Sequence, residues 1–236
     1  MGKAKNNDGD SIYEQLTRLE AKKAIPVIIR KENTRQYRWQ RKEYPSGLHY
    51  GLPTSPQKMG RYNDPSARTG ACYTADYPIV SLAEAWGRLY QKCNDKKTFF
   101  IGSREIQIAQ LYILETTRKT KTIDITRLVG LLHRTLDQVT GNDTSIPQAI
   151  VDWAANTPGL DYDGISYPSR HHAVGLCTAF WEREGTSSPL ADISHCSVES
   201  YVDSDPVNFP QNWLDKDING FEMLTETLNF VINPDE

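Results

Sequence analysis

Apolar residues recur at helical spacing in several parts of the chain. At residues 11–24 they fall three to four positions apart, behind Ser11, a residue type suited to cap a helix. Helix signals return at Tyr77 and Pro78, because proline is tolerated in a first helical turn, and one apolar face continues to residue 90. The same spacing predicts three further helices, at residues 126–139, 147–155 and 220–232.

Strand signals lie between these helices. Residues 106–114 show an alternating component, inside a β-rich stretch at 98–117 that contains two such runs. Further strands are predicted at residues 36–41, 71–75, 164–167, 176–182 and 192–202. Helices and strands follow one another without a steady alternation of strand, helix and strand, which favours the α+β class with a mixed β core flanked by helices.

A long irregular segment follows the first predicted strand. Residues 43–64 are rich in Pro, Gly, Ser and Asn, and such a segment in a compact domain is more often a functional loop than an idle connection. Residues 1–10 are polar and are expected to form a loose leader. We therefore expect a leader and helix over residues 1–24 and a single domain over residues 25–236.

Composition and charge narrow the class of protein. The chain has 236 residues, of which 38% are hydrophobic and 24% charged, so it is long enough to bury a core and has ordinary globular composition. A formal net charge of −3 and a pI near 6.0 give no broad basic surface for nucleic acid. Six Lys or Arg residues nevertheless lie at 30–42, and they would suit either the phosphates of a small ligand or a charged strand edge.

The cysteine spacing indicates whether metal or redox chemistry is expected, and the hydropathy of the chain indicates whether it enters or crosses a membrane. The cysteines are widely spaced and form no C-x-x-C pair, so zinc and thioredoxin-type chemistry are poorly supported. They are Cys72, Cys93, Cys177 and Cys196. No apolar stretch reaches the ~20 residues needed to cross a bilayer, and residues 1–10 lack the apolar segment of a signal peptide. We expect free thiols, no metal, no membrane association and a cytoplasmic protein, with delivery to another cell left open.

One carboxylate stands apart in the predicted helix at 77–90. Glu84 lies about 140° around the helix from Ile79, so its side chain can project without entering the core. It could form an exposed pair with Arg88 one turn later, worth roughly 0.3–0.5 kcal/mol. It could equally be a functional group held against a substrate. The helix alone favours the exposed pair.

Polar clusters at element boundaries are the other candidates for chemistry, and none is a standard nucleotide-binding or metal-binding motif. They are YRWQR at 37–41, HYG at 49–51, GRYN at 60–63 and YPSRHH at 167–172. The last contains His171 and His172, which as neighbours on a strand would point to opposite faces. This geometry argues against a shared metal ion.

Taken in order, these runs resemble the RES-domain family, named after Arg, Glu and Ser. YRWQR at 37–41 is similar to the family's arginine strand, and GRYN at 60–63 to its G-R-[WFY]-N turn. YTA at 73–75 and Glu84 are similar to the strand and helix of its central motif, and DGISYPS at 163–169 to its D-G-[IV]-x-Y-P-S run. The resemblance covers residues 36–184.

Two departures from the family pattern stand out. The run DPSARTG at 64–70 takes the place of a shorter N-x-x-G turn, and the separation of Glu84 from Ser169 is longer than in compact members. Both departures bear on the lid and the partner surface more than on the chemistry.

The resemblance implies an ADP-ribosyltransferase-like fold and an enzyme that consumes NAD as its substrate. On the matching positions it implies three catalytic residues, Glu84, Arg38 and Ser169. It implies contacts with the dinucleotide from Arg61, Tyr50, Tyr73 and Arg41. A cognate antitoxin or immunity protein is the implied partner.

These residue types suit cleavage of the nicotinamide–ribose bond. The departing nicotinamide is already a cationic pyridinium and needs no general acid, while the ribose passes through an oxocarbenium-like state. Glu84 would stabilise the positive charge on the ribose. Arg38 and Arg61 would bind phosphate oxygens through a planar fork of donors that lysine lacks. Ser169 would orient a phosphate or Arg38, because nothing near it in sequence marks an activated nucleophile.

Purely structural roles for the same residues remain as alternatives. Tyr73 could be a core strand residue, Tyr50 an exposed loop residue, and Arg61 a donor to carbonyls of its own turn. Ser169 could simply cap a turn. Three hypotheses therefore stand for the whole chain: an NAD glycohydrolase or phosphorylase, a protein ADP-ribosyltransferase of the same fold, and an inactive module that binds a nucleotide or a partner.

Overall fold

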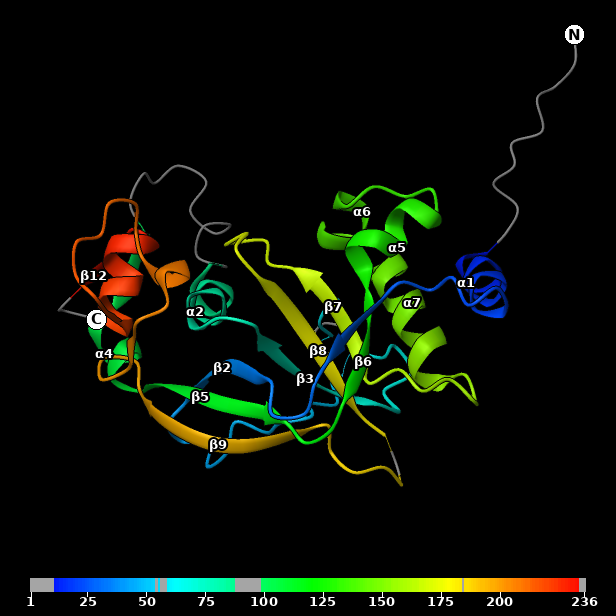
Figure 1. Ribbon diagram of the computed structural model, residues 1–236, viewed down its shortest axis with the longest axis horizontal. Helices are drawn as coiled ribbons and strands as arrows, with labels where there is room; N and C mark the ends of the chain where they lie inside the picture. Colours follow the sequence, from blue (N-terminus) through cyan, green and yellow to red (C-terminus); the bar gives the residue numbers. More distant parts are fainter. Residues whose placement is uncertain (1–10, 54, 56–58, 88–98, 184, 234–236) are drawn as a thin grey trace, which may run out of the picture.

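An eight-stranded mixed sheet forms the centre of the computed structural model, which describes residues 11–53, 55, 59–87, 99–183 and 185–233 (Figure 1). Its strand order is β1-β6-β7-β8-β3-β2-β5-β9, with β6 and β7 parallel and the other neighbours antiparallel. The strands are β1 (Val27–Arg30), β2 (Arg35–Arg41), β3 (Gly70–Ala75), β5 (Ala109–Thr116), β6 (Thr120–Asp124), β7 (Gly164–Pro168), β8 (Leu176–Glu182) and β9 (Leu190–Ser197).

Four helices gather at the β1–β6–β7 end of the sheet (Figure 1). They are α1 (Ile12–Ala21), α5 (Ile125–Leu131), α6 (Asp137–Thr140) and α7 (Ser145–Asn156). Ser11 and Glu14 form a capping box that starts α1, as the sequence predicted for Ser11. The single helix predicted at 126–139 is wrong, because the chain turns at His133, where φ is +53°, and so divides it into α5 and α6.

A smaller unit forms at the other end of the sheet. A two-stranded parallel sheet joins β4 (Phe99–Gly102) to β12 (Phe230–Asn233). Beside it lie α4 (Ser103–Gln107), α8 (Gly220–Glu222) and the π-helical turn η3 (Met223–Thr227) (Figure 1). The predicted helix at 220–232 is therefore wrong in its second half, and the start of the predicted strand at 106–114 is helical.

Short elements complete the C-terminal third. They are β10 (Val202–Asp203), the 3-10 turn η2 (Pro206–Asn208) and β11 (Ile218–Asn219), with β10 and β11 paired. The strand predicted at 192–202 ends earlier than expected, at Ser197.

Apolar side chains pack on both faces of the large sheet. The larger cluster lies between the sheet and the helices, among them α2 (Pro78–Trp86), which begins at Pro78 as predicted, while residues 88–90 of the predicted helix lie outside the described residues. A smaller cluster on the other face contains Tyr112 and Phe180, and Leu48 and Tyr50 from the irregular segment at 43–64 pack against it. Residues 48–50 of that segment therefore lie over the sheet face opposite α2, whereas Tyr62 near its end belongs to the larger cluster.

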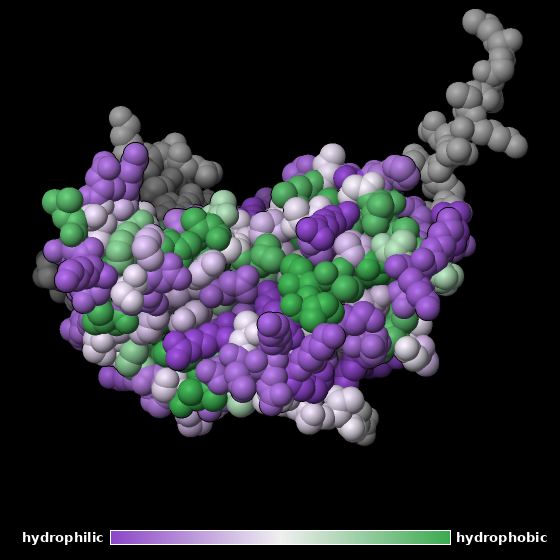
Figure 2. All heavy atoms as spheres, viewed as in Figure 1, coloured by the Kyte–Doolittle hydropathy of each residue, from purple (hydrophilic) through white to green (hydrophobic). Residues whose placement is uncertain are grey.

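The view in Figure 2 shows mostly polar side chains, with a group of hydrophobic ones near the middle of the face. Among the described residues, no helix is both long and apolar enough to cross a bilayer. The structure confirms an α+β architecture with a mixed sheet flanked by helices.

Candidate active site

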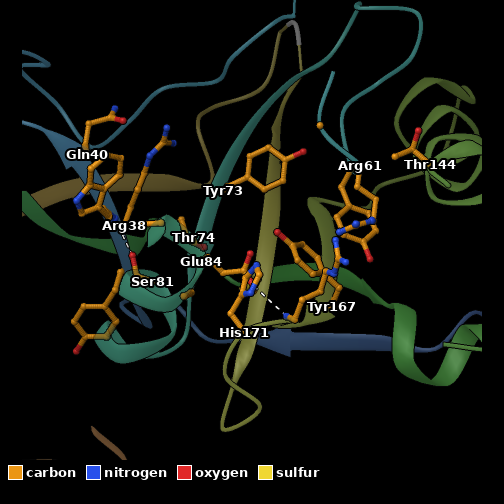
Figure 3. A pocket seen from close by; sticks show the side chains of 18 residues that line it. Arg38, Gln40, Arg61, Tyr73, Thr74, Ser81, Glu84, Thr144, Tyr167 and His171 are labelled. Carbon is orange, nitrogen blue, oxygen red and sulfur yellow. Dashed lines mark hydrogen bonds between the residues drawn. The ribbon is translucent and has the colours of Figure 1, made fainter. Parts of the chain in front are cut away.

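A pocket of about 520 Å³ opens where β2 and β3 separate. These strands pair only at Tyr37 and Ala75, whereas β2 pairs with β5 along its whole length. We call the open part the fork, with residues 38–41 of β2 and 70–74 of β3 as its arms. Both arms, α2, the segment before β3 and the β7–β8 connection line the pocket (Figure 3). Its volume is within the usual range for small-molecule sites.

The β2 arm finds its hydrogen-bond partner in α2 instead of in β3. The backbone N–H of Trp39 donates to Ser81 Oγ at 2.8 Å, which satisfies a donor that a closed sheet would have paired. The indole of Trp39 packs edge-to-face on Trp86, with 5.4 Å between ring centroids. These two contacts hold α2 over the fork on either side of Glu84 in sequence.

Glu84 is half-buried on α2 and lines the pocket. Its Oε1 accepts hydrogen bonds from Ser169 Oγ at 2.6 Å and from the backbone N–H of Arg170 at 3.1 Å. Both donors come from the connection between β7 and β8, which lies beside α2 (Figure 1). Arg88, its alternative partner, lies outside the described residues. The carboxylate is thus fixed at the pocket by a loop that is distant in sequence.

Ser169 contacts Glu84 but does not itself line the pocket. It is 8% exposed, and its Oγ also accepts hydrogen bonds from the backbone N–H groups of His171 and His172, each at 3.1 Å. The next turn packs closely on α2, since a Cβ at Gly87 would lie 2.2 Å from His171 Cγ. Ser169 was predicted to orient a phosphate or Arg38; in the structure it orients Glu84.

Arg61 lines the same pocket as Glu84. Its Nε and Nη2 donate to the carbonyl of Gly141 at 3.1 and 2.5 Å, and not to carbonyls of its own turn. Arg170, a residue that the sequence placed only within a polar cluster, also lines the pocket. Desolvation and the neighbouring Arg61 charge lower the pKa of Arg170, while Glu84 opposes this shift. Two guanidinium groups and one carboxylate therefore converge here.

Arg38 lines the pocket on the β2 arm, but Nη1 of its guanidinium donates hydrogen bonds to groups outside the pocket lining. Its Nη1 donates to the carbonyl of His49 at 3.1 Å and to Cys72 Sγ at 2.8 Å. Cys72 belongs to the cluster on the sheet face opposite α2. In Figure 3, Arg38 and Arg61 lie on opposite sides of Tyr73. Both hydrogen bonds use Nη1, so this nitrogen could bind a ligand in the pocket only by exchanging them.

Aromatic side chains form much of the remaining wall. Tyr62 stacks on Tyr167 with 4.0 Å between ring centroids, and its hydroxyl donates to the carbonyl of Val139 at 2.9 Å. Tyr73 donates to Asn63 Oδ1 at 3.3 Å. Burial raises the pKa of Tyr62, Tyr73 and Tyr167, and the Glu84 charge adds to the shift at Tyr62 and Tyr167. All three hydroxyls therefore stay protonated at neutral pH.

Two residues expected to bind the dinucleotide lie outside the pocket. Tyr50 packs in the cluster on the opposite sheet face, and its hydroxyl shares a hydrogen bond of 2.8 Å with Ser188. Arg41, at the end of β2, is exposed and lies 3.9 Å from Glu43. Neither residue lines this pocket, because Tyr50 packs on the far face of the sheet and Arg41 is at the exposed end of β2.

Ser81 and Thr144 are among the pocket residues for which the sequence carried no functional signal, and Trp39 was singled out only as part of the YRWQR run. The roles of Trp39 and Ser81 depend on the fork, which is a feature of strand pairing. Trp39 Nε1 is buried without a hydrogen-bond partner among the described residues.

The cysteines of the described part, Cys72, Cys177 and Cys196, are free thiols, while Cys93 lies outside the described residues. Cys177 lines the pocket, and burial raises its pKa, with a further contribution from Glu84. It is therefore a neutral thiol. Within the part of the chain that the structure describes, no three His, Cys, Asp or Glu side chains gather as a metal site would require.

A model of the RES domain matches residues 35–199. The chain belongs to the RES-domain family. The match includes both arms of the fork, α2 and the β7–β8 connection, and so the whole set Arg38, Arg61, Glu84 and Ser169. At residues 64–70 of this RES domain, the carboxylate of Asp64 accepts hydrogen bonds from Ser66, Arg68 and Thr69.

The RES fold is also recognisable among solved structures. A chain of the M. tuberculosis MbcT–MbcA toxin–antitoxin complex matches with a TM-score of 0.57 and 16% identity, over 90% of this chain and 96% of that one. No curated protein matches the sequence. At this identity the likeness establishes the fold alone: this chain shares the fold of that chain over most of its length.

Proposed function

We propose that this RES protein consumes NAD by breaking its nicotinamide–ribose bond and passing ADP-ribose to water or phosphate. The observation that carries the proposal is the Glu84 carboxylate, held by Ser169 and Arg170 at the wall of a pocket that Arg61 also lines. This arrangement suits the reaction because positive charge develops on the ribose, where a carboxylate is stabilising, and the diphosphate is negative, where guanidinium groups are stabilising. We assign the catalytic unit to residues 25–236.

Glu84 would act on the ribose. As the bond to nicotinamide lengthens, positive charge spreads over the anomeric carbon and ring oxygen, and a nearby fixed carboxylate stabilises it. Nicotinamide leaves as a neutral molecule with the bonding electron pair, so no proton has to be delivered to it. Ser169 would act through Glu84 by holding one carboxylate oxygen and leaving the other to the substrate.

The guanidinium groups would bind the diphosphate. Arg61 and Arg170 line one pocket, and an arginine can bind a phosphate through two parallel hydrogen bonds. Arg38 would join them from the β2 arm, through Nε and Nη2 or after Nη1 releases His49 and Cys72. Tyr73 would pack on the ribose or the nicotinamide.

A protein partner that covers the pocket is part of the proposal. An enzyme that depletes NAD would harm its own cell unless it is restrained, and the solved structure that this chain resembles is that of a toxin–antitoxin complex. We propose a cognate antitoxin as the partner and the cytoplasm as the place where both act.

Release of nicotinamide from NAD by the purified protein tests the proposal. Glu84→Gln keeps an acceptor for Ser169 and Arg170 while removing the charge, so it should abolish release and leave the circular dichroism spectrum unchanged. With labelled NAD, free ADP-ribose or its phosphate ester supports the proposed reaction. A labelled protein band would instead identify an ADP-ribosyltransferase, and binding of NAD without turnover an inactive module.

A further inference from the structure

The shape of the pocket depends on the angle at which β2 leaves β3. The two strands share one residue pair, Tyr37 with Ala75. Beyond it the arms diverge, with Trp39 on one arm and Tyr73 on the other. A single pair of residues fixes this angle poorly, because backbone hydrogen bonds at one position leave the strands free to splay. Side chains at the closed end of the fork are therefore needed to fix the angle between β2 and β3.

Gln36 joins the two strands at that closed end. Its side chain is 1% exposed and reaches from β2 to the residues on both sides of Ala75. Its Nε2 donates to Asp76 Oδ1 at 3.0 Å, and its Oε1 accepts from Thr74 Oγ1 at 2.8 Å. Both of these partners lie on the β3 side of the fork, and Nε2 also donates to the backbone carbonyl of Arg35 on β2 at 2.8 Å.

Asp76 is itself fixed to the rest of the sheet. Its Oδ1 accepts from Arg30 Nη2 at 3.0 Å, and its Oδ2 accepts from the backbone N–H of Leu176 at 3.4 Å. Arg30 is buried and also donates to Thr122 and Ser166 in β6 and β7. Gln36 therefore ties β2 to a buried polar network that extends across the central strands.

We propose that Gln36 is a positioning residue that sets the opening of the fork, and so the placement of the β2 arm against Glu84. Gln36 does not line the pocket, so any effect on turnover acts through the strands and not through contact with substrate. The bond from Trp39 to Ser81 holds the open arm to α2, as the dashed line at Ser81 in Figure 3 shows. Because Gln36 holds the closed end of the fork and Ser81 holds the β2 arm at the open end, the distance across the pocket is fixed before a ligand binds. The inference rests on the proposed NAD-consuming function.

The test compares Gln36→Met with Thr116→Val. Methionine keeps the length of the side chain and removes the two hydrogen bonds to the β3 side together with the local one to the Arg35 carbonyl, while Asp76 retains Arg30 and Leu176. Thr116 is buried and makes two hydrogen bonds, to Lys31 and Thr34, away from the fork. We expect nicotinamide release by Gln36→Met to show a kcat about tenfold below wild type with KM changed less than threefold. Thr116→Val should lose comparable thermal stability and keep its kcat.

Gln36→Glu gives the second arm of the test. It places a carboxylate oxygen against Asp76 Oδ1 and the Arg35 carbonyl, which both accept from Gln36 Nε2 in wild type, so its kcat should be impaired as well. Equal kcat for wild type and Gln36→Met, or a loss in Thr116→Val as large as in Gln36→Met, would overturn the proposal.

Hydrogen exchange separates this inference from the proposed function. Peptides covering residues 36–41 and 70–76 should exchange faster in Gln36→Met than in Thr116→Val, whatever reaction the protein performs. If wild type releases no nicotinamide, the proposed function fails, and the exchange result alone decides whether Gln36 holds the fork. Unchanged exchange in both peptides would show that it does not.

Discussion

Replacing Ser169 by alanine removes the hydroxyl that holds Glu84. The bond from Ser169 Oγ to Glu84 Oε1 is 2.6 Å long and joins a hydroxyl donor to a carboxylate. A hydrogen bond to a charged group contributes about 1.5–3 kcal/mol, and the lower half of that range applies here because Glu84 is only half-buried and keeps the Arg170 N–H. If this holds Glu84 in its productive position, kcat/KM for nicotinamide release should fall by roughly 10- to 30-fold.

The assay needs a control for loss of structure. Ser169 also accepts the N–H groups of His171 and His172, so the variant should melt a few degrees lower. Ser188→Ala removes a partly buried hydroxyl contact on the opposite sheet face, to Tyr50, and should leave turnover unchanged. Activity within twofold of wild type in Ser169→Ala would refute the positioning role. A loss as complete as that of Glu84→Gln would refute it as well, because Ser169 would then take part in the chemistry.

Two further predictions concern the segment before β3. Arg61→Lys keeps the charge but cannot bind phosphate with a fork of donors, so KM for NAD should rise about tenfold. Arg68→Lys, on the same segment but outside the pocket lining, should leave KM unchanged. Equal KM values for the two variants would show that Arg61 does not bind the ligand. Burial opposes ionisation of Asp64, but hydrogen bonds from Ser66, Asn156 and Thr69 outweigh it and lower the pKa of this carboxyl. Its contribution to stability is therefore present above about pH 4, the ordinary aspartate value, and is lost as pH falls through the lowered pKa. Asp64→Asn should melt a few degrees below wild type at pH 7, with the difference shrinking below pH 4; a difference independent of pH would contradict the assignment.

The strands and helices that carry the site were predictable from local patterns. β2, β3, β7, β8, α2 and α7 each have an apolar face or run of their own, and the family motifs lie on them. β6 was missed because it reads as polar: Thr120 and Thr122 are fully buried, and Thr122 bonds to Arg30 and Ser166. A strand of this kind is stabilised by a polar network whose members are distant in sequence.

Pairings between distant segments explain the other differences. Residues 230–233 form β12 because they pair with β4, although their apolar spacing continues that of a helix. Within the site, Arg38 and Tyr50 were grouped with Glu84 by motif order, which carries no information on sheet faces. The period of two along β2 places Tyr37 and Trp39 toward α2, and Arg38 away from it, once the register with β5 is known.

The central claim is that the Glu84 carboxylate stabilises the ribose as nicotinamide departs. Nicotinamide release from NAD by wild type and by Glu84→Gln tests it most directly, with circular dichroism to confirm that both are folded. The account predicts steady release by wild type and none above background by the variant. Equal release by the two proteins would contradict it.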